Sequence, residues 1–259
     1  MKVTLIQTHL FWEDREKNLA HFDSLLASLK TETNLIVLPE MFTTGFSMDP
    51  AKTAEDHRSR TFEWMKLKAL EKNAIITGSV AVKEGHNYYN RLHWVEPDGT
   101  TSFYDKRHLF RMAKEDEKYI AGKQKILKQV GNWRVMPLIC YDLRFPVWSR
   151  NFQNQEPMYD VLVYVANWPQ VRSYPWKHLL IARAIENQCY VIGVNRIGKD
   201  GNGYDHSGDS VVINPRGEII SHIQDNEEAV ETFELDWNYL DEFRKTFPVG
   251  LDSDSFELK

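Results

Sequence analysis

Three polar residues stand directly after short apolar runs, where a strand is expected to end, and their side chains suit a single reaction. Glu40 follows the run 35–38, Lys106 follows 103–105, and Cys140 follows 135–139. The carboxyl ends of strands form the usual ligand crevice of α/β sheets. We therefore expect the carboxylate, the ammonium and the thiol to meet in one small pocket.

A carboxylate, a cation and a thiol together can cleave an amide through a covalent intermediate. A free thiol has a pKa of about 8.5 and needs a base or a cation to react at neutral pH. Burial raises the pKa of a carboxylate, so Glu40 can accept the thiol proton. Lys106 favours the thiolate and later faces the tetrahedral oxyanion. The backbone N–H of Tyr141, the residue after the nucleophile, is the second oxyanion donor.

Each residue taken alone has a simpler structural explanation. Cys140 resembles the small buried thiols that fill hydrophobic cores. Glu40 resembles an acid at the start of a helix, where the helix dipole favours negative charge. Lys106 lies in a basic cluster typical of a solvated turn. The catalytic interpretation therefore depends on the three residues acting together.

The elements that must position these residues follow from hydrophobic periodicity. Val- and Ile-rich runs bounded by polar residues predict buried strands at Val3–Gln7, Leu35–Leu38, Ala74–Val82, Val135–Ile139, Val161–Val165 and Tyr190–Val194. Amphipathic spacing predicts helices at 16–30, 61–72 and 176–188. Turn residues at 96–99 and 215–217 predict two hairpins, and 205–207 is expected to be a polar loop.

Strands that alternate with helices favour an α/β fold with a mixed sheet or paired sheets. The chain has 259 residues, no internal repeat and no Pro/Gly/Ser linker, so we expect one domain over 1–259. Residues 247–259 are expected to form an extended C-terminal arm that could reach a neighbouring subunit. The N-terminal run resembles a first strand rather than a signal peptide.

Composition argues against several classes of partner. The formal net charge is -5, the pI is about 6.0, and no dense Lys/Arg block occurs, so nucleic-acid binding is not expected. No stretch reaches the roughly 18 apolar residues of a membrane span. Cys140 and Cys189 are too few for an extracellular disulfide framework, which favours a reducing cytoplasm. Cys189 is expected to be a packed core thiol.

Neither a metal nor a cofactor is expected from motif spacing. No His, Cys and Asp cluster has the spacing of metal ligands along the chain. The glycines between 198 and 203 do not form a phosphate-binding loop. Asp205, His206 and Ser207 are adjacent, and adjacent residues cannot form a hydrolase triad.

Three segments together closely resemble the signature segments of the nitrilase superfamily. They are Leu38–Phe42 (LPEMF), Tyr104–Phe110 (YDKRHLF) and Ile139–Pro146 (ICYDLRFP). The resemblance extends from the first strand to about Leu235 and is strongest to bacterial omega-amidases. It implies a four-layer α-β-β-α sandwich, a homodimer or higher oligomer, and a small-molecule amide substrate. That substrate is the terminal amide of a dicarboxylic acid monoamide, such as 2-oxoglutaramate or 2-oxosuccinamate.

The resemblance also implies roles for individual residues. Glu40 matches the general base, Lys106 the oxyanion lysine and Cys140 the nucleophile. A second glutamate stands seven positions before a glycine in this family, which selects Glu115 ahead of Gly122, with Glu117 as the fallback. Here an alanine, and not the proline of many relatives, precedes that glycine.

Substrate-binding residues are expected close to the triad. Arg144, four residues after Cys140, could pair with a substrate carboxylate, although a structural salt bridge inside the turn between sheet and helix is the favoured explanation. Arg172 and Lys177 are alternatives. We expect Trp168 to wall the pocket and Phe42 and Phe46 to close over the acyl chain; all three could instead be core residues.

Other functions remain open at this point. Within the superfamily the alternatives are a nitrilase, an N-carbamoyl amino acid amidohydrolase or an aliphatic amidase. A non-catalytic binding protein on this fold is expected to lack a triad residue, whereas all three positions are filled. A glutaminase domain that feeds ammonia to a synthetase needs an attached synthetase domain.

Overall fold

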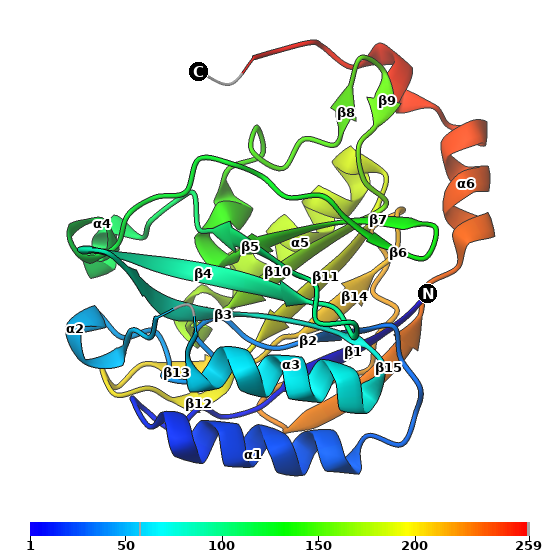
Figure 1. Ribbon diagram of the computed structural model, residues 1–259. Helices are drawn as coiled ribbons and strands as arrows, with labels where there is room; N and C mark the ends of the chain where they lie inside the picture. The colour runs from blue at the N-terminus through cyan, green and yellow to red at the C-terminus, as the bar shows by residue number, and fades with distance from the viewer. Residues whose placement is uncertain (57, 258–259) are drawn as a thin grey trace.

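Two β-sheets face each other, with helices on their outer faces. The computed structural model describes residues 1–56 and 58–257 (Figure 1). The first sheet has the strand order β15-β1-β2-β3-β4-β5. Its strands are β15 (Ala229–Glu234), β1 (Lys2–Gln7), β2 (Leu35–Val37), β3 (Ile75–Glu84), β4 (Asn87–Val95) and β5 (Thr101–Asp105). Strands β1, β2 and β3 run parallel, and the outer pairs are antiparallel.

Two amphipathic helices cover the outer face of this sheet, α1 (Arg15–Ser28) and α3 (Arg60–Lys72) (Figure 1). Helix α1 begins where the Asp14 side chain accepts a hydrogen bond from the Lys17 N–H, and α3 begins at the equivalent cap on Ser59. Their apolar faces join one hydrophobic cluster with the sheet, through residues such as Phe22 and Trp64. The sequence placed both helices within two residues of their observed ends.

The second sheet has five strands in the order β14-β11-β10-β7-β6. These are β14 (Val211–Ile213), β11 (Tyr190–Asn195), β10 (Val161–Ala166), β7 (Trp133–Ile139) and β6 (Lys128–Val130). Helix α5 (Ser173–Asn187) packs against β11 and β14. A Cβ at Gly193 of β11 would stand 2.6 Å from Leu180 and 2.9 Å from Trp176, so only glycine permits this close helix-to-sheet approach.

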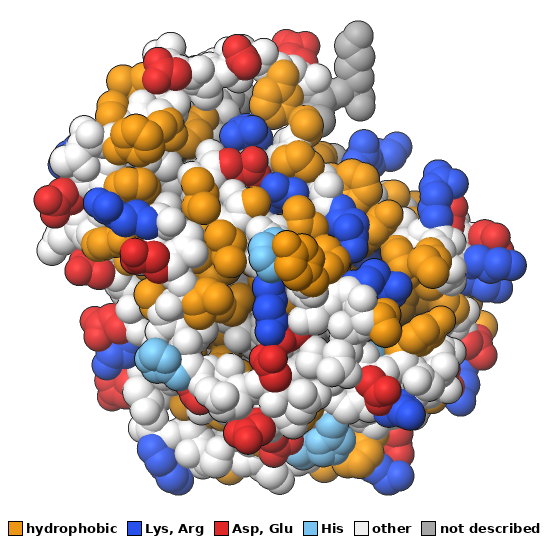
Figure 2. Space-filling model, turned by 180° about the vertical axis from the view of Figure 1, so that it is seen from behind, with side chains coloured by type: hydrophobic (Ala, Val, Ile, Leu, Met, Phe, Trp, Pro, Cys, Tyr) orange, Lys and Arg blue, Asp and Glu red, His pale blue; other side chains and the backbone are white. Residues whose placement is uncertain are grey.

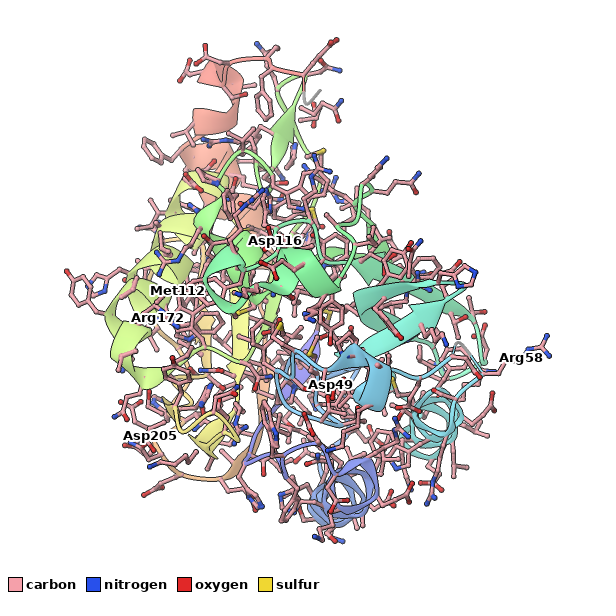
Figure 3. All side chains as sticks on the ribbon, turned by 90° about the vertical axis from the view of Figure 1, so that its left-hand side faces the viewer. Asp49, Arg58, Met112, Asp116, Arg172 and Asp205 are labelled. Carbon is pink, nitrogen blue, oxygen red and sulfur yellow. The ribbon has the colours of Figure 1, made fainter. Side chains whose placement is uncertain are left out.

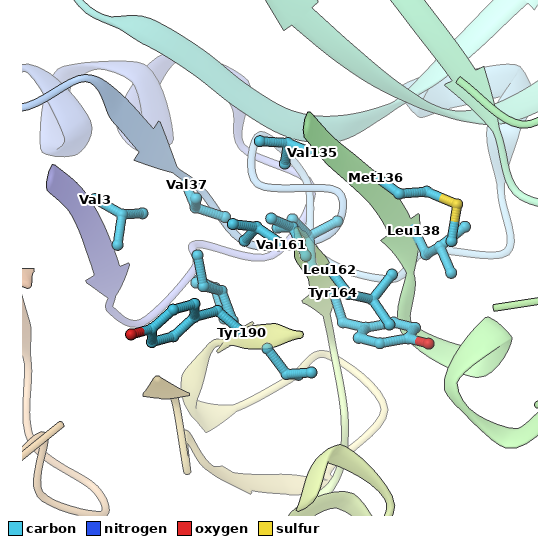
Figure 4. Close-up of a cluster of buried hydrophobic side chains, with 14 of the residues drawn as sticks. Val3, Val37, Val135, Met136, Leu138, Val161, Leu162, Tyr164 and Tyr190 are labelled. Atoms are coloured by element: carbon cyan, nitrogen blue, oxygen red, sulfur yellow. The ribbon is translucent and has the colours of Figure 1, made fainter. Parts of the chain in front are cut away.

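The core lies between the two sheets. Val3 and Val37 from the first sheet join Val135, Val161 and Tyr190 from the second in one buried cluster (Figure 4). All six residues of β10 are buried, as expected of a parallel strand covered on both faces. The prediction of a four-layer α-β-β-α sandwich is confirmed.

Short elements and loops connect these layers. The helices among them are α2 (Pro50–Thr53), α4 (Glu115–Lys118) and α6 (Trp237–Thr246). The 3₁₀ turns are η1 (Arg111–Ala113), η2 (Cys140–Arg144), η3 (Gln170–Arg172) and η4 (Val249–Asp252). Two small hairpins pair β8 (Phe152–Gln153) with β9 (Glu156–Pro157) and β12 (Ile197–Lys199) with β13 (Asp205–Ser207). None of the helices in the described residues combines the length and apolar character needed to cross a membrane.

Three local predictions need correction or refinement. The expected polar loop at 205–207 is strand β13, because it pairs with β12. The hairpin expected around 215–217 is reduced to strand β14 and a single bridge between Ile213 and Ile219. The C-terminal arm begins with the turn η4, whose Gly250 packs closely against Phe152; residues 258–259 lie outside the described part.

Candidate active site

The three triad residues lie just beyond strand ends, two from one sheet and one from the other. Glu40 lies in the turn after β2, and Lys106 follows β5. Cys140 begins η2, directly after β7, with a positive φ of 43°. A cysteine rarely adopts this left-handed conformation, and such strain is typical of a functional turn.

A buried ionic network surrounds the Lys106 ammonium. Its Nζ lies 2.8 Å from Glu40 Oε1 and 3.0 Å from each carboxylate oxygen of Glu115. The side chains of all three residues are at most 1% exposed. The expected meeting of Glu40 and Lys106 is therefore observed.

Burial and charge together determine the pKa of Lys106. Burial alone lowers the pKa of an amine, but the negative charges of Glu115 and Glu40 outweigh it and raise the pKa of Lys106. The side chain therefore stays an ammonium at physiological pH. A fixed cation that already has its partners needs little reorganisation when an oxyanion forms beside it.

The Cys140 thiol shares the pocket with Lys106, and it is a protonated thiol rather than a thiolate. Burial and the neighbouring Glu40 charge raise the pKa of Cys140 well above its usual value, and Lys106 opposes this only in part. The Lys106 ammonium does favour the thiolate, as expected, but burial and the Glu40 charge outweigh its effect on the pKa of Cys140. The proton has to leave during the attack, and Glu40 is the neighbouring carboxylate that can accept it.

Of the two candidates for the second glutamate, Glu115 is the one that contacts Lys106. Glu115 is fully buried, whereas Glu117 is exposed. Besides Lys106, Glu115 Oε2 accepts a 2.6 Å hydrogen bond from the Phe110 N–H. Gly122 allows the loop to close here, because its N–H donates to the Lys106 carbonyl at 2.9 Å and a Cβ would stand 2.0 Å from the Asp105 carbonyl oxygen.

Two asparagines that we did not assign a role hold the Glu40 carboxylate. Asn90 Nδ2, from β4, donates to Glu40 Oε1 at 2.8 Å and to Glu115 Oε1 at 3.2 Å. The Asn167 backbone N–H donates to Glu40 Oε2 at 2.8 Å. Asn167 follows directly on β10, so the strand-end rule that identified Glu40 applies to it as well. No motif pointed to Asn90.

A small pocket with a volume of about 90 Å³ opens onto Lys106 and Cys140. Figure 3 looks at the side of the molecule that carries Met112, Asp116 and Arg172, the last of which lines this pocket. The wall is mostly aromatic and apolar. It is lined by Phe46, Met48, Phe110, Tyr141, Trp168 and Pro169, with polar groups from Arg144, Asn167, Arg172, Tyr204 and His206.

Arg144 and Trp168 line this pocket together. The Arg144 guanidinium lies 4.9 Å from the centre of the Trp168 ring, and Trp168 is fixed by a 2.6 Å hydrogen bond from its Nε1 to the Arg172 carbonyl. Within residues 1–56 and 58–257, no carboxylate lies within ion-pair distance of Arg144. The structural salt bridge that we considered for Arg144 is therefore not observed.

Phe46 and Phe42 have different surroundings. Phe46 lines the pocket, and its ring centre lies 4.9 Å from Lys106 Nζ. Phe42 is fully buried against Phe22 and Trp64 in the outer core, at centroid distances of 5.3 and 5.9 Å. The expectation that Phe42 closes over the acyl chain is corrected, because its side chain points into the layer under α1 and α3.

Arg172 and Lys177, the two alternatives to Arg144, have different surroundings. Arg172 lines the pocket, with its guanidinium 5.3 Å from the Phe110 ring centre. Lys177 pairs instead with Asp209 at 2.6 Å, outside the pocket lining. His206, which we did not consider alone, is 2% exposed and lines the pocket, and burial lowers its pKa to about 4.

Asp142, two residues after the thiol, links the cysteine turn to the lysine segment. Its Oδ2 accepts hydrogen bonds from the Ile139 N–H at 3.0 Å and the Tyr104 hydroxyl at 2.7 Å. Its Oδ1 accepts the His108 N–H at 3.0 Å. One buried carboxylate thus bridges the turn that carries Cys140 and the strand that leads to Lys106.

Comparison with known proteins points to one family. The family model described as "Carbon-nitrogen hydrolase" matches residues 2–245. The chain is 50% identical over 260 residues to "Omega-amidase YafV" of Escherichia coli K12, covering 100% of this chain and 98% of that protein. It is 30% identical over 250 residues to "2-oxoglutaramate amidase" of Bacillus subtilis 168, covering 95% of each. The fold matches a Xanthomonas campestris CN-hydrolase superfamily protein, XC1258, with a TM-score of 0.97 and 42% identity, covering 100% and 99% of the two chains.

Proposed function

Because this chain belongs to the carbon-nitrogen hydrolase family, we propose that it hydrolyses the terminal amide of a small dicarboxylic acid monoamide at Cys140. The substrate class follows the relatives named omega-amidase and 2-oxoglutaramate amidase. The observation that carries the proposal is the Glu40–Lys106–Glu115 network, whose Lys106 lines the same pocket as the Cys140 thiol.

The first half of the reaction forms a thioester. Glu40 takes the thiol proton while Cys140 Sγ attacks the amide carbon, and the carbonyl oxygen becomes an oxyanion. The Lys106 ammonium and the Tyr141 N–H stabilise that oxyanion. Glu40 then gives its proton to the amide nitrogen, the carbon–nitrogen bond breaks, and ammonia leaves.

The second half hydrolyses the thioester. Glu40 deprotonates a water molecule that attacks the thioester carbon, and Lys106 again faces the oxyanion. The carbon–sulfur bond breaks, the acid is released, and the proton held by Glu40 returns to the Cys140 thiol. Glu115 keeps Lys106 in position by its two 3.0 Å contacts throughout.

Asn167 is suited to recognise the amide nitrogen. Its Oδ1 is buried and has no hydrogen-bond partner among the described residues, and the residue lines the pocket. A buried acceptor without a partner costs about 1–3 kcal/mol. An amide N–H of the substrate can satisfy it and so orient the amide toward Cys140.

Arg144 is suited to hold the far carboxylate of the substrate. It lines the pocket beside the apolar Trp168 ring and has no carboxylate partner among the described residues. A guanidinium can form two parallel hydrogen bonds with a carboxylate. Arg172, which also lines the pocket, is the alternative.

The test is a panel of substrates scored by ammonia release. It contains 2-oxoglutaramate, 2-oxosuccinamate, a simple aliphatic amide, a nitrile and an N-carbamoyl amino acid. We expect the two oxo-monoamides to have the highest kcat/KM. Replacing Arg144 by Met should raise KM for these two while leaving the neutral aliphatic amide little affected.

The cysteine variants provide the control for this panel. Cys140→Ala should abolish turnover, whereas Cys189→Ala should retain it, because Cys189 is a buried core thiol outside the pocket. Higher kcat/KM for the nitrile or the carbamoyl compound would replace the substrate assignment by one of the sibling activities. Normal turnover in Cys140→Ala would overturn the mechanism.

We further propose a homo-oligomer in a reducing cytoplasm. Large apolar side chains at Met112, Val171 and Tyr174 are more than 70% exposed, which favours contact with another subunit. Two free cysteines, one of them the proposed nucleophile, suit a reducing compartment. Light scattering and cell fractionation test these two statements separately.

A further inference from the structure

We propose that His9, His21 and Glu228 form a binding site for one transition-metal dication of the Zn²⁺ type, outside the active site. Their ligand atoms all lie within 4.8 Å of one another. Glu228 Oε2 lies 2.9 Å from His21 Nε2 and 3.6 Å from His9 Nδ1. Among the residues that the structure describes, this is the one group of three such ligands.

The ligand set and its spacing suit zinc. Zn²⁺ binds imidazole nitrogen at about 2.0–2.1 Å and carboxylate oxygen at about 2.0–2.2 Å, in tetrahedral geometry. Two ligands of a tetrahedron with bonds of this length stand about 3.3 Å apart. Two of the three separations, 2.9 and 3.6 Å, bracket that value, and the distance between the two histidine ligand atoms is within 4.8 Å, so side-chain rotations can bring all three ligands onto one ion.

The surrounding contacts already hold these side chains in place. The Thr8 hydroxyl lies 2.7 Å from His21 Nε2 and 2.5 Å from Glu228 Oε2. The two imidazole rings are 4.5 Å apart, and the edge of the Phe11 ring packs against both. A metal ion replaces the hydrogen bond between Thr8 and His21, and Thr8 remains able to orient the Glu228 carboxylate.

Three segments distant in the chain provide the ligands, and solvent can reach them. His9 follows β1 and pairs with Ile197 at the start of β12, His21 lies on α1, and Glu228 precedes β15. The side chains are 42%, 18% and 40% exposed, which leaves room for water at the remaining coordination position. A bound metal ion would therefore connect α1 to the edge of the first sheet.

Motif spacing did not predict this group, because His21 and Glu228 lie 207 residues apart in the chain. The expectation that the protein binds no metal came only from ligands close together in sequence. It remains untested by the structure. The proposed site does not depend on the proposed amidase function, since no triad residue takes part in it.

The test is a titration of metal-free protein with Zn²⁺ by calorimetry, supported by Co²⁺ absorption. We expect one equivalent of saturable binding and a rise in Tm of several degrees in excess Zn²⁺, because a ligand that binds only the folded state stabilises it. Cys140→Ala should bind equally well. Since a thiol also binds zinc, loss of the signal in Cys140→Ala would assign it to the active site and overturn the proposal.

The variants separate the site from non-specific binding. His21→Ala should weaken Zn²⁺ binding by about 100-fold or more, given that loss of even an outer partner costs about 10–100-fold. Glu228→Gln keeps the side-chain volume at an exposed position, and it should weaken binding without unfolding the chain. His86→Ala, at an exposed histidine outside the group, should bind as the parent does. Absence of saturable binding, or equal binding in His21→Ala, refutes the site.

Discussion

The charge of the buried network of Glu40, Lys106 and Glu115 helps to keep the Cys140 thiol protonated. Glu40 and Glu115 are two carboxylates that share the single cation Lys106, so the network already carries a net negative charge when both are ionised. A thiolate beside it adds a second uncompensated negative charge in a buried site. Burial of the thiol is the larger cause of the raised pKa of Cys140, and the nearby negative charge of Glu40 adds to it.

The first prediction concerns the reactivity of this thiol in the free enzyme. In the Cys189→Ala background, the rate of alkylation of Cys140 by iodoacetamide should keep rising with pH through about 9, because its pKa lies above the usual value of about 8.5. Mass spectrometry of the alkylated protein against pH measures this. A plateau near pH 6 to 7 would show a preformed thiolate and contradict the assignment of Glu40 as acceptor during attack.

The second prediction separates the two neighbouring glutamates. Glu115→Gln should lower kcat by about 100-fold, because Lys106 loses an anionic partner, and small displacements of a catalytic group cost about this much. Glu117→Gln, two residues away and exposed, is the matched control and should keep kcat within about twofold of the parent. Steady-state ammonia release gives both values. Equal losses in the two variants would remove Glu115 from the site.

At the scale of elements, the site depends on strand ends from both sheets being held in register. Glu40 and Lys106 belong to the first sheet and Cys140 to the second, so no single sheet fixes their distance. The Asn167 N–H, at the end of β10, joins the second sheet to Glu40 of the first. Asp142 provides the other link, from the cysteine turn to Tyr104 and His108.

The third prediction tests Asp142 as a positioning residue. Tyr104→Phe removes one hydrogen bond to Asp142, and it should lower kcat more than it raises KM, since Tyr104 is absent from the pocket lining. Asp142→Asn should lower kcat further, by about 100-fold. Tyr164→Phe removes another buried hydroxyl, which has no hydrogen-bond partner among the described residues, and it serves as the control. A fall in thermal stability with kcat unchanged in Tyr104→Phe would show that Asp142 supports the fold alone.

At the scale of the whole molecule, Asp160 connects the C-terminal helix α6 to the second sheet. This fully buried carboxylate, just before β10, contacts Arg134 of β7 at 2.8 Å and Arg244 of α6 at 2.6 Å. Burial alone raises the pKa of Asp160, but the hydrogen bonds from Arg134 and Arg244 outweigh it and lower that pKa. Because both sheets and α6 share one buried cluster, we propose that the chain folds as one domain.

The fourth prediction follows from this pKa. Asp160→Asn should lower the free energy of unfolding by about 3 kcal/mol at pH 7, at the low end for a broken buried pair because Arg134 is partly exposed. The folded pKa is depressed, so the contribution is present above the unfolded value of about 3.9 and is lost as pH falls through the folded value.

Urea unfolding at pH 7 and near pH 3 measures the difference. The gap between parent and Asp160→Asn should shrink at the lower pH. Asp241→Asn, which breaks an exposed ion pair with Lys245 on the same helix, is the control and should cost less than about 1 kcal/mol. A gap that does not change with pH would assign the effect to packing and not to the charge of Asp160.

The sequence by itself determined the elements and the chemistry. Periodicity located the core strands and helices α1 and α3, and the strand-end positions of Glu40, Lys106 and Cys140 predicted one reactive pocket. These features are local: they depend on neighbouring residues and on the alternation of apolar and polar side chains, so a single chain without its fold reveals them. The choice of Glu115 over Glu117 came instead from the resemblance to the nitrilase superfamily, whose pattern places that glutamate seven positions before a glycine.

Only the tertiary structure decided which side chains, distant in the sequence, lie close enough to interact and which of them are buried. It placed Phe42 in the core, kept Cys140 protonated, brought Asn90 to two carboxylates, and assembled His9 and His21 with Glu228. Burial and electrostatic coupling depend on the three-dimensional distance between groups, and residues up to 234 positions apart are hydrogen-bonded here. No pattern along the chain encodes those distances.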